Sequence, residues 1–196
     1  MDEDLGESTR LSPNPMRRTI EPAYRVREAC EADLVALPFI EHAAAQLFLS
    51  TPYPEIAREQ PSTVDEFRHW REHAALFVVT AADGAAIGFA IAFDVDGAAH
   101  LHEIDVDPRH GRRGVGKQLV RAVESWAVQR GYTRMTLATF REVPWNAPYY
   151  HRLGFRELPA GQAGAGLLAL RERERANGLA IEGRLFMVRD LAQPRQ

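Results

Sequence analysis

The 196-residue sequence predicts a mixed α+β fold of the α/β class, in which a central, mostly antiparallel mixed sheet is flanked by helices. Three observations support this fold class. Helical and strand periodicities alternate along the chain, with no internal repeat. Two Asp-Gly pairs, Asp83-Gly84 and Asp96-Gly97, separate apolar runs and are typical of tight hairpins between antiparallel strands. A strongly amphipathic helix follows the last of these runs and would cover one face of the sheet.

The N-terminal part predicts a lead segment, one strand and two helices. Residues 1–22 are rich in charge, Ser and Pro, so we expect a disordered lead there, followed by one domain over 23–192. A short strand is expected over 24–29. Thr63 as an N-cap, with acidic residues in the next turn, predicts the start of the second helix. Apolar residues at helical spacing predict the first helix over 31–48; they are Leu34, Leu37, Ile40, Ala44 and Leu47.

The centre and the C-terminal part predict the rest of the sheet. Strands are expected over 76–80, 86–93 and 98–106, as a meander closed by the two Asp-Gly turns. Apolar residues at helical spacing then run from Val115 to Gly131, a natural C-cap, and predict a helix. The remaining elements are strands over 135–140 and 181–188 and helices over 146–153 and 167–177, the last solvated because Arg and Glu alternate along it.

Composition restricts the classes of function. The net charge of −3 comes from 24 basic and 27 acidic residues, so there is no global basic field and we expect no nucleic-acid partner. The apolar run 74–93 is interrupted by Asp83-Gly84, which argues against a membrane partner. The first residues lack the apolar segment of a secretory signal, and Cys30 is the only cysteine, which together indicate a reducing, cytoplasmic location. A single cysteine also excludes a cysteine-based zinc cluster, and no metal is expected.

The loop between the strand that ends at Val106 and the amphipathic helix is the most informative motif. Its glycines leave backbone N–H groups uncovered, and the following helix directs its positive end to the same point, so the loop predicts a phosphate site. A nucleotide-triphosphate loop would need Ser or Thr after Lys117 to hold magnesium, but Gln118 stands there and disfavours that alternative. The candidate loop residues are Gly111, Arg112, Arg113, Gly114, Val115, Gly116 and Lys117.

A second motif lies about one strand and one helix downstream, where Asn146 precedes Tyr150 and then Leu153-Gly154-Phe155. Together with Val106-Asp107-Pro108 and the glycine loop, this order resembles the GNAT superfamily of acyl-CoA-dependent N-acetyltransferases over residues 24–158. The resemblance implies the GNAT fold over the 23–192 domain, with acetyl-CoA as co-substrate. One position departs from the family pattern. Gly111 stands where the family usually has Arg or Gln, which affects a side-chain contact more than the backbone cradle.

The resemblance also implies roles for individual residues. The diphosphate of coenzyme A would lie on loop 111–117, and the pantetheine arm would lie along the strand edge at Ile104 and Val106 and bond to Asn146. The amide of Ile104 would stabilise the oxyanion that develops on the thioester. Tyr150 would be the general acid that protonates the departing thiolate.

Acetyl transfer to an amine also needs a proton acceptor, because an alkylammonium has a pKa near 10. His100 and His102 share one strand face and resemble the paired histidines of the arylalkylamine N-acetyltransferase branch. Glu103 and water are the alternatives. Strand alternation places Glu103 on the opposite face, together with Asp105, but a bulge would change which side chains point inward.

We therefore expect an N-acetyltransferase that moves the acetyl group of acetyl-CoA directly to a primary amine of a small molecule in a ternary complex. Two alternatives stay open: a non-catalytic acyl-CoA-binding sensor, and an acetyltransferase that acts on protein amines. Acidic residues near the cleft would favour a cationic acceptor. A homodimer is possible because dimers are the commonest oligomers.

Overall fold

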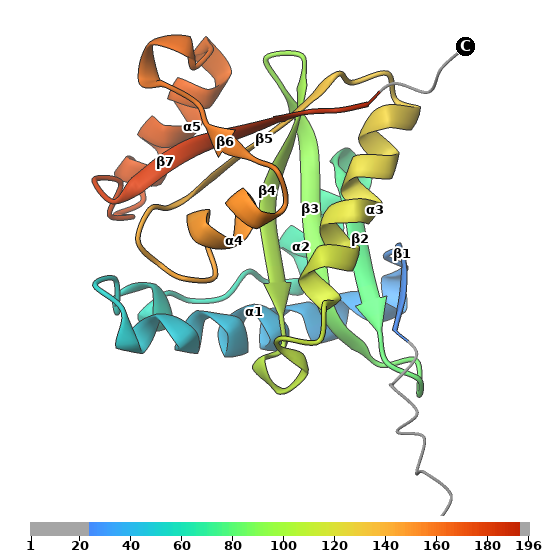
Figure 1. Ribbon diagram of the computed structural model, residues 1–196. Helices are drawn as coiled ribbons and strands as arrows, with labels where there is room; N and C mark the ends of the chain where they lie inside the picture. Colours follow the sequence, from blue (N-terminus) through green and yellow to red (C-terminus); the bar gives the residue numbers. More distant parts are fainter. Residues whose placement is uncertain (1–23, 193–196) are drawn as a thin grey trace, which may run out of the picture.

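The computed structural model describes residues 24–192, so the expected lead segment 1–22 lies outside the described residues. Seven strands form one sheet in the order β1-β2-β3-β4-β5-β7-β6 (Figure 1). Neighbouring strands are antiparallel, except that β4 and β5 run parallel. The predicted fold class is confirmed. The strands are β1 (Arg25–Glu28), β2 (Ala75–Thr80), β3 (Ala86–Val95), β4 (Ala98–Val106), β5 (Arg134–Phe140), β6 (Arg156–Glu157) and β7 (Arg184–Asp190).

Helices cover both faces of the sheet. On one face, α3 (Val115–Gln129) and α4 (Ala147–Arg152) contribute to the largest core cluster, which includes residues of β2 to β5 and of β7. On the other, α1 (Leu37–Ala45) and α2 (Val64–His73) form a second cluster with β2 and β3. The fifth helix, α5 (Ala165–Ala176), packs through Leu167 on Val95 and Phe186. Short 3-10 helices complete the chain: η1 (Glu31–Ala36), η2 (Gln46–Ser50), η3 (Ile56–Arg58), η4 (Pro108–His110) and η5 (Ala160–Gln162).

The expected elements are present, with differences at their ends. The final strand begins at Arg184 rather than at Ile181, because the Arg184 amide donates to the Ile181 carbonyl and closes a turn there. Leu47, expected on the buried stripe of the first helix, is 41% exposed because the α-helix has given way to η2. The two-residue strand β6 was not expected.

The helical run Glu31–Ser50 is long and apolar enough to cross a membrane, judged by length and composition alone. Three of its apolar side chains, Leu34, Leu37 and Ile40, are at most 5% exposed and pack in one cluster with Phe89 of β3. The apolar face of this run is therefore part of the core.

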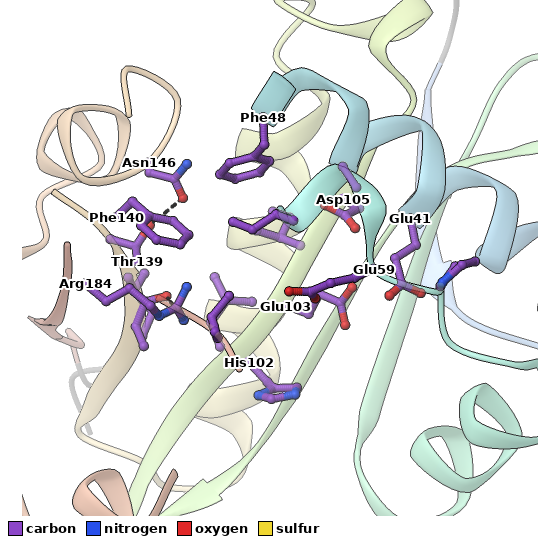
Figure 2. Close-up of a pocket in the computed structure, with 18 of the residues that line it drawn as sticks. Glu41, Phe48, Glu59, His102, Glu103, Asp105, Thr139, Phe140, Asn146 and Arg184 are labelled. Atoms are coloured by element: carbon purple, nitrogen blue, oxygen red, sulfur yellow. Dashed lines mark hydrogen bonds between the residues drawn. The ribbon is translucent and has the colours of Figure 1, made fainter. Parts of the chain in front are cut away.

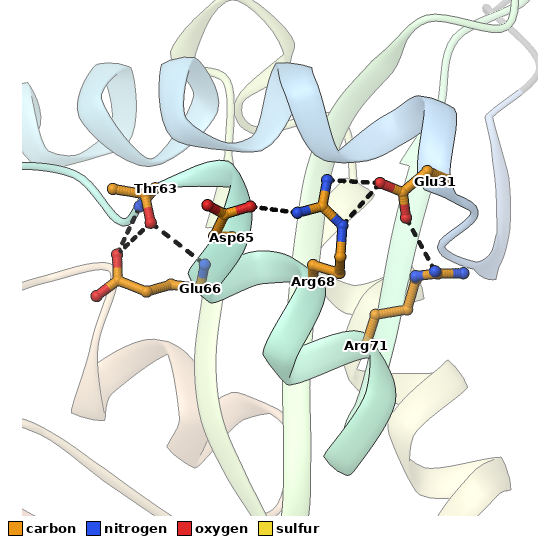
Figure 3. A network of polar contacts seen from close by, with 6 residues as sticks. All are labelled: Glu31, Thr63, Asp65, Glu66, Arg68 and Arg71. Carbon is orange, nitrogen blue, oxygen red and sulfur yellow. Dashed lines mark hydrogen bonds and ion pairs between the residues drawn. The ribbon is translucent and has the colours of Figure 1, made fainter.

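A polar network orients α2 on the start of the first helical run (Figure 3). As predicted, Thr63 caps α2: its Oγ1 accepts from the Glu66 amide at 3.2 Å, and the Glu66 carboxylate accepts from the Thr63 amide at 2.7 Å. Glu31 of η1 accepts from Arg68 at 2.7 Å and from Arg71 at 2.9 Å. Exposed pairs of this kind each contribute little free energy to folding.

Two irregularities of β4 create the site. Its pairing with β3 shifts because Ile91 faces Glu103 while Ala92 faces Leu101, so His102 is an extra residue in a β-bulge. Its pairing with β5 is limited to residues 99–101 against 135–137. Beyond Leu101 the two parallel strands therefore part, and β4 continues to Val106 with β3 as its partner.

Asp96, in the turn between β3 and β4, caps α5. Its two carboxylate oxygens accept from the amides of Gly166 at 2.8 Å and of Leu167 at 3.0 Å. These are first-turn amides of α5 that have no partner within the helix. The cap fixes α5 against the sheet, and with it Glu174, which pairs with Arg184 of β7.

Asp96→Ala is expected to lower the free energy of unfolding by about 1–2 kcal/mol, the usual loss for an N-cap acceptor. Alanine removes both hydrogen bonds and is also strained at φ 54°. Asp96→Asn should lose less, because asparagine tolerates this φ and keeps one oxygen. Chemical denaturation of the two variants measures the difference, and equal stabilities for alanine and wild type would contradict the cap.

Candidate active site

A cavity of about 250 Å³ lies where β4 and β5 part. Figure 2 shows it from close by. Five of the residues expected in the site line it, namely Tyr150, His102, Glu103, Ile104 and Asn146, whereas His100, Val106 and loop 111–117 do not. Further lining residues include Glu41, Phe48, Glu59, Asp105, Thr139, Phe140 and Arg184.

The two sides of the cavity differ in chemistry. Carboxyl groups gather on one side, from Glu41 of α1, Glu59 after η3, and Glu103 and Asp105 of β4 (Figure 2). The bulge at His102 brings Glu103 and Asp105 to this face, which corrects the expectation from simple alternation. Within residues 24–192, no group of three or more His, Cys, Asp or Glu side chains is arranged to hold a metal ion.

Desolvation and repulsion between neighbouring acids raise the pKa values of these carboxyls. Burial, and then the neighbouring Asp105, raise the pKa of Glu103 well above its usual value, and the two side chains share a hydrogen bond. Burial, and then the nearby Glu41, raise the pKa of Asp105 to about 7. Desolvation also raises the pKa of Glu41 and of Glu59. A cationic ligand would relieve this repulsion.

Arg184 lies across the cavity from the carboxyls (Figure 2). Its Nη2 donates to Glu174 of α5 at 2.9 Å, and its guanidinium lies 4.9 Å from the ring centroid of Phe140. The Arg184 and Glu174 side chains are only 13% and 21% exposed. Helix 167–177, expected to be merely solvated, thus places one carboxylate beside the site. This ion pair offsets the charge of Arg184, and with four carboxyls opposite one arginine the cavity keeps an excess of acidic groups.

The two histidines differ in environment. His100 is 2% exposed and lies outside the cavity, with its Nδ1 3.0 Å from the Thr136 hydroxyl. Burial lowers its pKa to about 3. His102 lines the cavity, with Trp70 and Phe93 at ring-centroid distances of 5.1 and 5.2 Å, and burial lowers its pKa to about 4. Both rings are neutral near pH 7, and only His102 faces the cavity.

Tyr150 is 6% exposed and lines the cavity, and no hydrogen bond to its hydroxyl is present within the described residues. Burial raises its pKa, which keeps the phenol protonated and able to donate. Asn146 precedes α4, but its side chain makes no capping bond. Instead its Oδ1 accepts from Thr139 at 2.6 Å, while its buried Nδ2 has no partner among residues 24–192. Buried donors are rarely left unpaired, so this amide is available to a ligand carbonyl.

The glycine loop has the backbone form of an anion cradle. Gly114 has φ 76° and precedes α3, and Arg112 also has a positive φ, of 57°. The Gln118 amide donates back to the Gly114 carbonyl at 3.1 Å, so the amides of Val115 to Lys117 precede the first intrahelical bond. The loop side chains Arg112, Arg113 and Lys117 are exposed.

Tyr149 connects this loop with the cavity. A Cβ atom at Gly116 would lie 3.1 Å from the Tyr149 hydroxyl, so this tyrosine reaches the first turn of α3. The next residue, Tyr150, lines the cavity, and the two rings are 5.4 Å apart. The cradle and the cavity are therefore adjacent parts of one site.

Sequence reasoning missed Glu41, Glu59, Asp105 and Arg184 as cavity residues. One signal was present for Glu41, which lies four residues after Leu37 and three before Ala44, and so on the buried stripe of α1. An acid on an apolar stripe indicates a functional or paired group. Asp105 lines the cavity because of the bulge at His102, which the sequence does not locate. Glu59 and Arg184 lie in or beside irregular segments whose position the sequence does not predict.

The chain is similar to known acetyltransferases in sequence and in fold. Residues 42–155 match the model of the acetyltransferase (GNAT) family. Aminoglycoside N(6')-acetyltransferase type 1 of Salmonella typhimurium is 36% identical over 95 residues, which are 44% of this chain and 65% of that protein, so the match spans a little less than two thirds of this relative. The same-named protein of Salmonella enteritidis matches equally.

Among solved structures, the ribosomal-protein-S18-alanine N-acetyltransferase of Escherichia coli has a TM-score of 0.60 at 20% identity, over 89% of this chain and 97% of that one. The PaiA N-acetyltransferase of Thermoplasma acidophilum, in complex with coenzyme A, has a TM-score of 0.64 at 14% identity, over 86% and 99%. At these identities the likeness shows a shared fold.

Proposed function

The chain belongs to the GNAT acetyltransferase family and is an acyltransferase, and from that premise we propose that it transfers acetyl from acetyl-CoA to a primary amine of a small molecule that carries more than one positive charge. One observation carries the choice of acceptor. Four carboxyl groups line the cavity between β4 and β5, and the arginine opposite them is neutralised by Glu174. A cation from solution is the partner that this cavity requires.

The residues on the cofactor side fit coenzyme A. The unpaired Asn146 Nδ2 suits a carbonyl of the pantetheine arm, and the amides at the start of α3 suit the diphosphate. Ile104 lies where β4 has left β5, so this strand edge is open to an extended amide chain. We assign Arg112, Arg113 and Lys117 to the phosphates because their exposed charges surround the cradle.

The cofactor side and the acidic side of the cavity together define the reaction. Acetyl-CoA supplies an activated acetyl thioester, and the amine attacks it directly, without an acyl-enzyme step. Tyr150 donates its proton to the leaving sulfur, because its raised pKa keeps the hydroxyl protonated inside the cavity. The acceptor arrives as an ammonium, so a group on the acidic side removes its proton before attack.

Two further facts support a polycationic acceptor. The aminoglycoside N(6')-acetyltransferase relatives are named for substrates with several amino groups. Phe48 and Phe140 also line the cavity, with ring centroids 5.7 Å apart, and aromatic faces attract cations. A protein acetyltransferase is among the structural neighbours, so the test must distinguish a small-molecule amine from a protein amine as the acceptor.

The test is a screen for coenzyme A release over matched amines. Diamines, polyamines and aminoglycosides are expected to give kcat/KM at least tenfold above monoamines of similar size, and their KM should rise with salt because the attraction is electrostatic. Zwitterionic amino acids and lysine-containing peptides are the controls. Equal rates with monoamines would contradict the acceptor class. Tight acetyl-CoA binding without turnover on any amine would support a sensor instead.

A further inference from the structure

We infer that Asp105 is the catalytic base of this site, and that Glu103 positions it through the hydrogen bond between the two carboxyl groups. The inference rests on the proposed acetyl transfer. Both residues line the cavity, and their side chains bond to each other across the face of β4. The opposite side of the cavity is formed by Asn146 and Arg184 (Figure 2).

The bulge at His102 makes this pair possible. Without the extra residue, strand alternation would turn Glu103 and Asp105 away from the face that carries the histidines. With it, the carboxyls lie on the cavity wall, two residues apart on one strand. Asp105 is also one residue beyond Ile104, which lies at the open edge of β4 where we place the thioester.

The charged groups around the pair favour one retained proton. Glu41 faces it from α1 and is held by the Ser62 amide at 2.9 Å, and Glu59 faces it from the segment after η3. Arg184 of β7 is neutralised by Glu174. His102 is neutral near pH 7, because burial lowers its pKa to about 4. No counter-cation therefore reaches Glu103 and Asp105 from the described residues.

Tyr150 gives an independent indication that this part of the cavity receives a ligand. It reaches the cavity from α4, is 94% buried, and has no hydrogen-bond partner for its hydroxyl among residues 24–192. A largely buried tyrosine whose free hydroxyl opens into the same cavity as two half-buried acids is the arrangement expected for a general acid and a base on either side of a reacting amine.

The hydrogen bond between the two carboxyls favours Glu103 as the site of the proton and Asp105 as the site of the charge, while burial and Glu41 raise the pKa of Asp105 overall, to about 7. A carboxylate with a raised pKa takes a proton from an ammonium of pKa about 10 more readily than His102, whose pKa burial lowers to about 4. Asp105 is therefore the better base.

Proton transfer to Asp105 precedes formation of the amide bond. An N–H bond of the ammonium breaks and an O–H bond forms on Asp105, which leaves a neutral amine. The nitrogen lone pair forms the C–N bond of the product amide, the C–S bond breaks, and the sulfur receives the Tyr150 proton. The second amine proton leaves the nitrogen and restores the tyrosine. One proton in total passes from Asp105 to solvent.

The test compares kcat/KM for the best amine between pH 5.5 and 9 in the full-length protein and its variants. Wild type is expected to lose activity as the pH falls through about 7, because protonated Asp105 cannot accept a proton. Asp105→Asn should be about 100-fold slower at pH 7.5 and should lose this acid limb. Glu103→Ala should move the loss of kcat/KM to a higher pH, because Asp105 loses the hydrogen bond that Glu103 donates. Glu103→Gln still donates a hydrogen bond and should leave the pH of this loss unchanged.

Asp190→Asn is the matched control, because Asp190 is 67% exposed at the end of β7, outside the cavity, and should leave the profile unchanged. Coenzyme A affinity checks that each variant is folded. An acid limb that survives in Asp105→Asn, or that is abolished by Glu103→Gln, would overturn the assignment. A wild type that releases no coenzyme A with any amine would remove the proposed function and this inference together.

Discussion

Replacement of Tyr150 by phenylalanine is expected to lower kcat by about 10²- to 10⁴-fold, with little change in the affinity for acetyl-CoA. The phenol lies in the cavity, is 6% exposed, and has no competing hydrogen-bond partner in the described part of the chain. Phenylalanine keeps the ring and its 5.7 Å contact with Phe155 but removes the proton that the thiolate needs. A loss confined to kcat is the signature of an interaction made in the transition state.

The measurement is steady-state kinetics beside direct titration with coenzyme A. Tyr132→Phe is the matched control, because Tyr132 follows the far end of α3 and packs on Trp126, with ring centroids 5.6 Å apart. Its turnover should equal that of wild type. Unchanged kcat for Tyr150→Phe across the pH range would exclude the phenol as the proton donor.

Gly114→Val is expected to raise the dissociation constant of coenzyme A more than tenfold, a loss of at least about 1.4 kcal/mol. Gly114 has φ 76°, a conformation that a β-branched residue adopts only with strain of about 1–2 kcal/mol. Apart from its chain neighbours, no atom of the described residues lies within 4 Å of a Cβ built there, so packing in this part of the chain does not oppose the side chain. The strain and the bulk instead act on the open side of the cradle, where we place the diphosphate.

Gly131→Val separates cofactor binding from stability. Gly131 follows the other end of α3, has φ 82°, and likewise has no atom of the described chain within 4 Å of its Cβ position, its chain neighbours apart. Both variants should be destabilised to a similar degree, because the backbone strain is the same, but only Gly114→Val should bind coenzyme A weakly. Isothermal titration calorimetry with thermal unfolding of both proteins tests this, and equal affinities would mean that the loop is not the diphosphate site.

Local patterns were enough to predict most of the fold. The two Asp-Gly turns, the apolar spacing of α3 and the Thr63 cap each depend on residues close together in the sequence, and each is present in the structure. The family resemblance came from motifs of the same local kind. Such signals survive without tertiary context because turn geometry, capping and helical periodicity are set by neighbouring residues.

The residue-level chemistry required the tertiary structure. Simple alternation separated Glu103 and Asp105 from the histidines, and the family resemblance drew attention to His100, which lies outside the cavity. A one-residue bulge reversed that alternation, and its position depends on how β3 pairs with β4.

The sequence by itself determined the elements, their order and the turn before α3, because these follow from short-range conformational preferences, whereas Tyr150 was singled out by the family resemblance. Only the tertiary structure decided that β4 and β5 part after Leu101, and that Glu41, Glu59 and Arg184 surround the opening. Burial by distant segments sets the pKa values of the carboxyls there, and burial is a property of the packed chain rather than of any local run of residues.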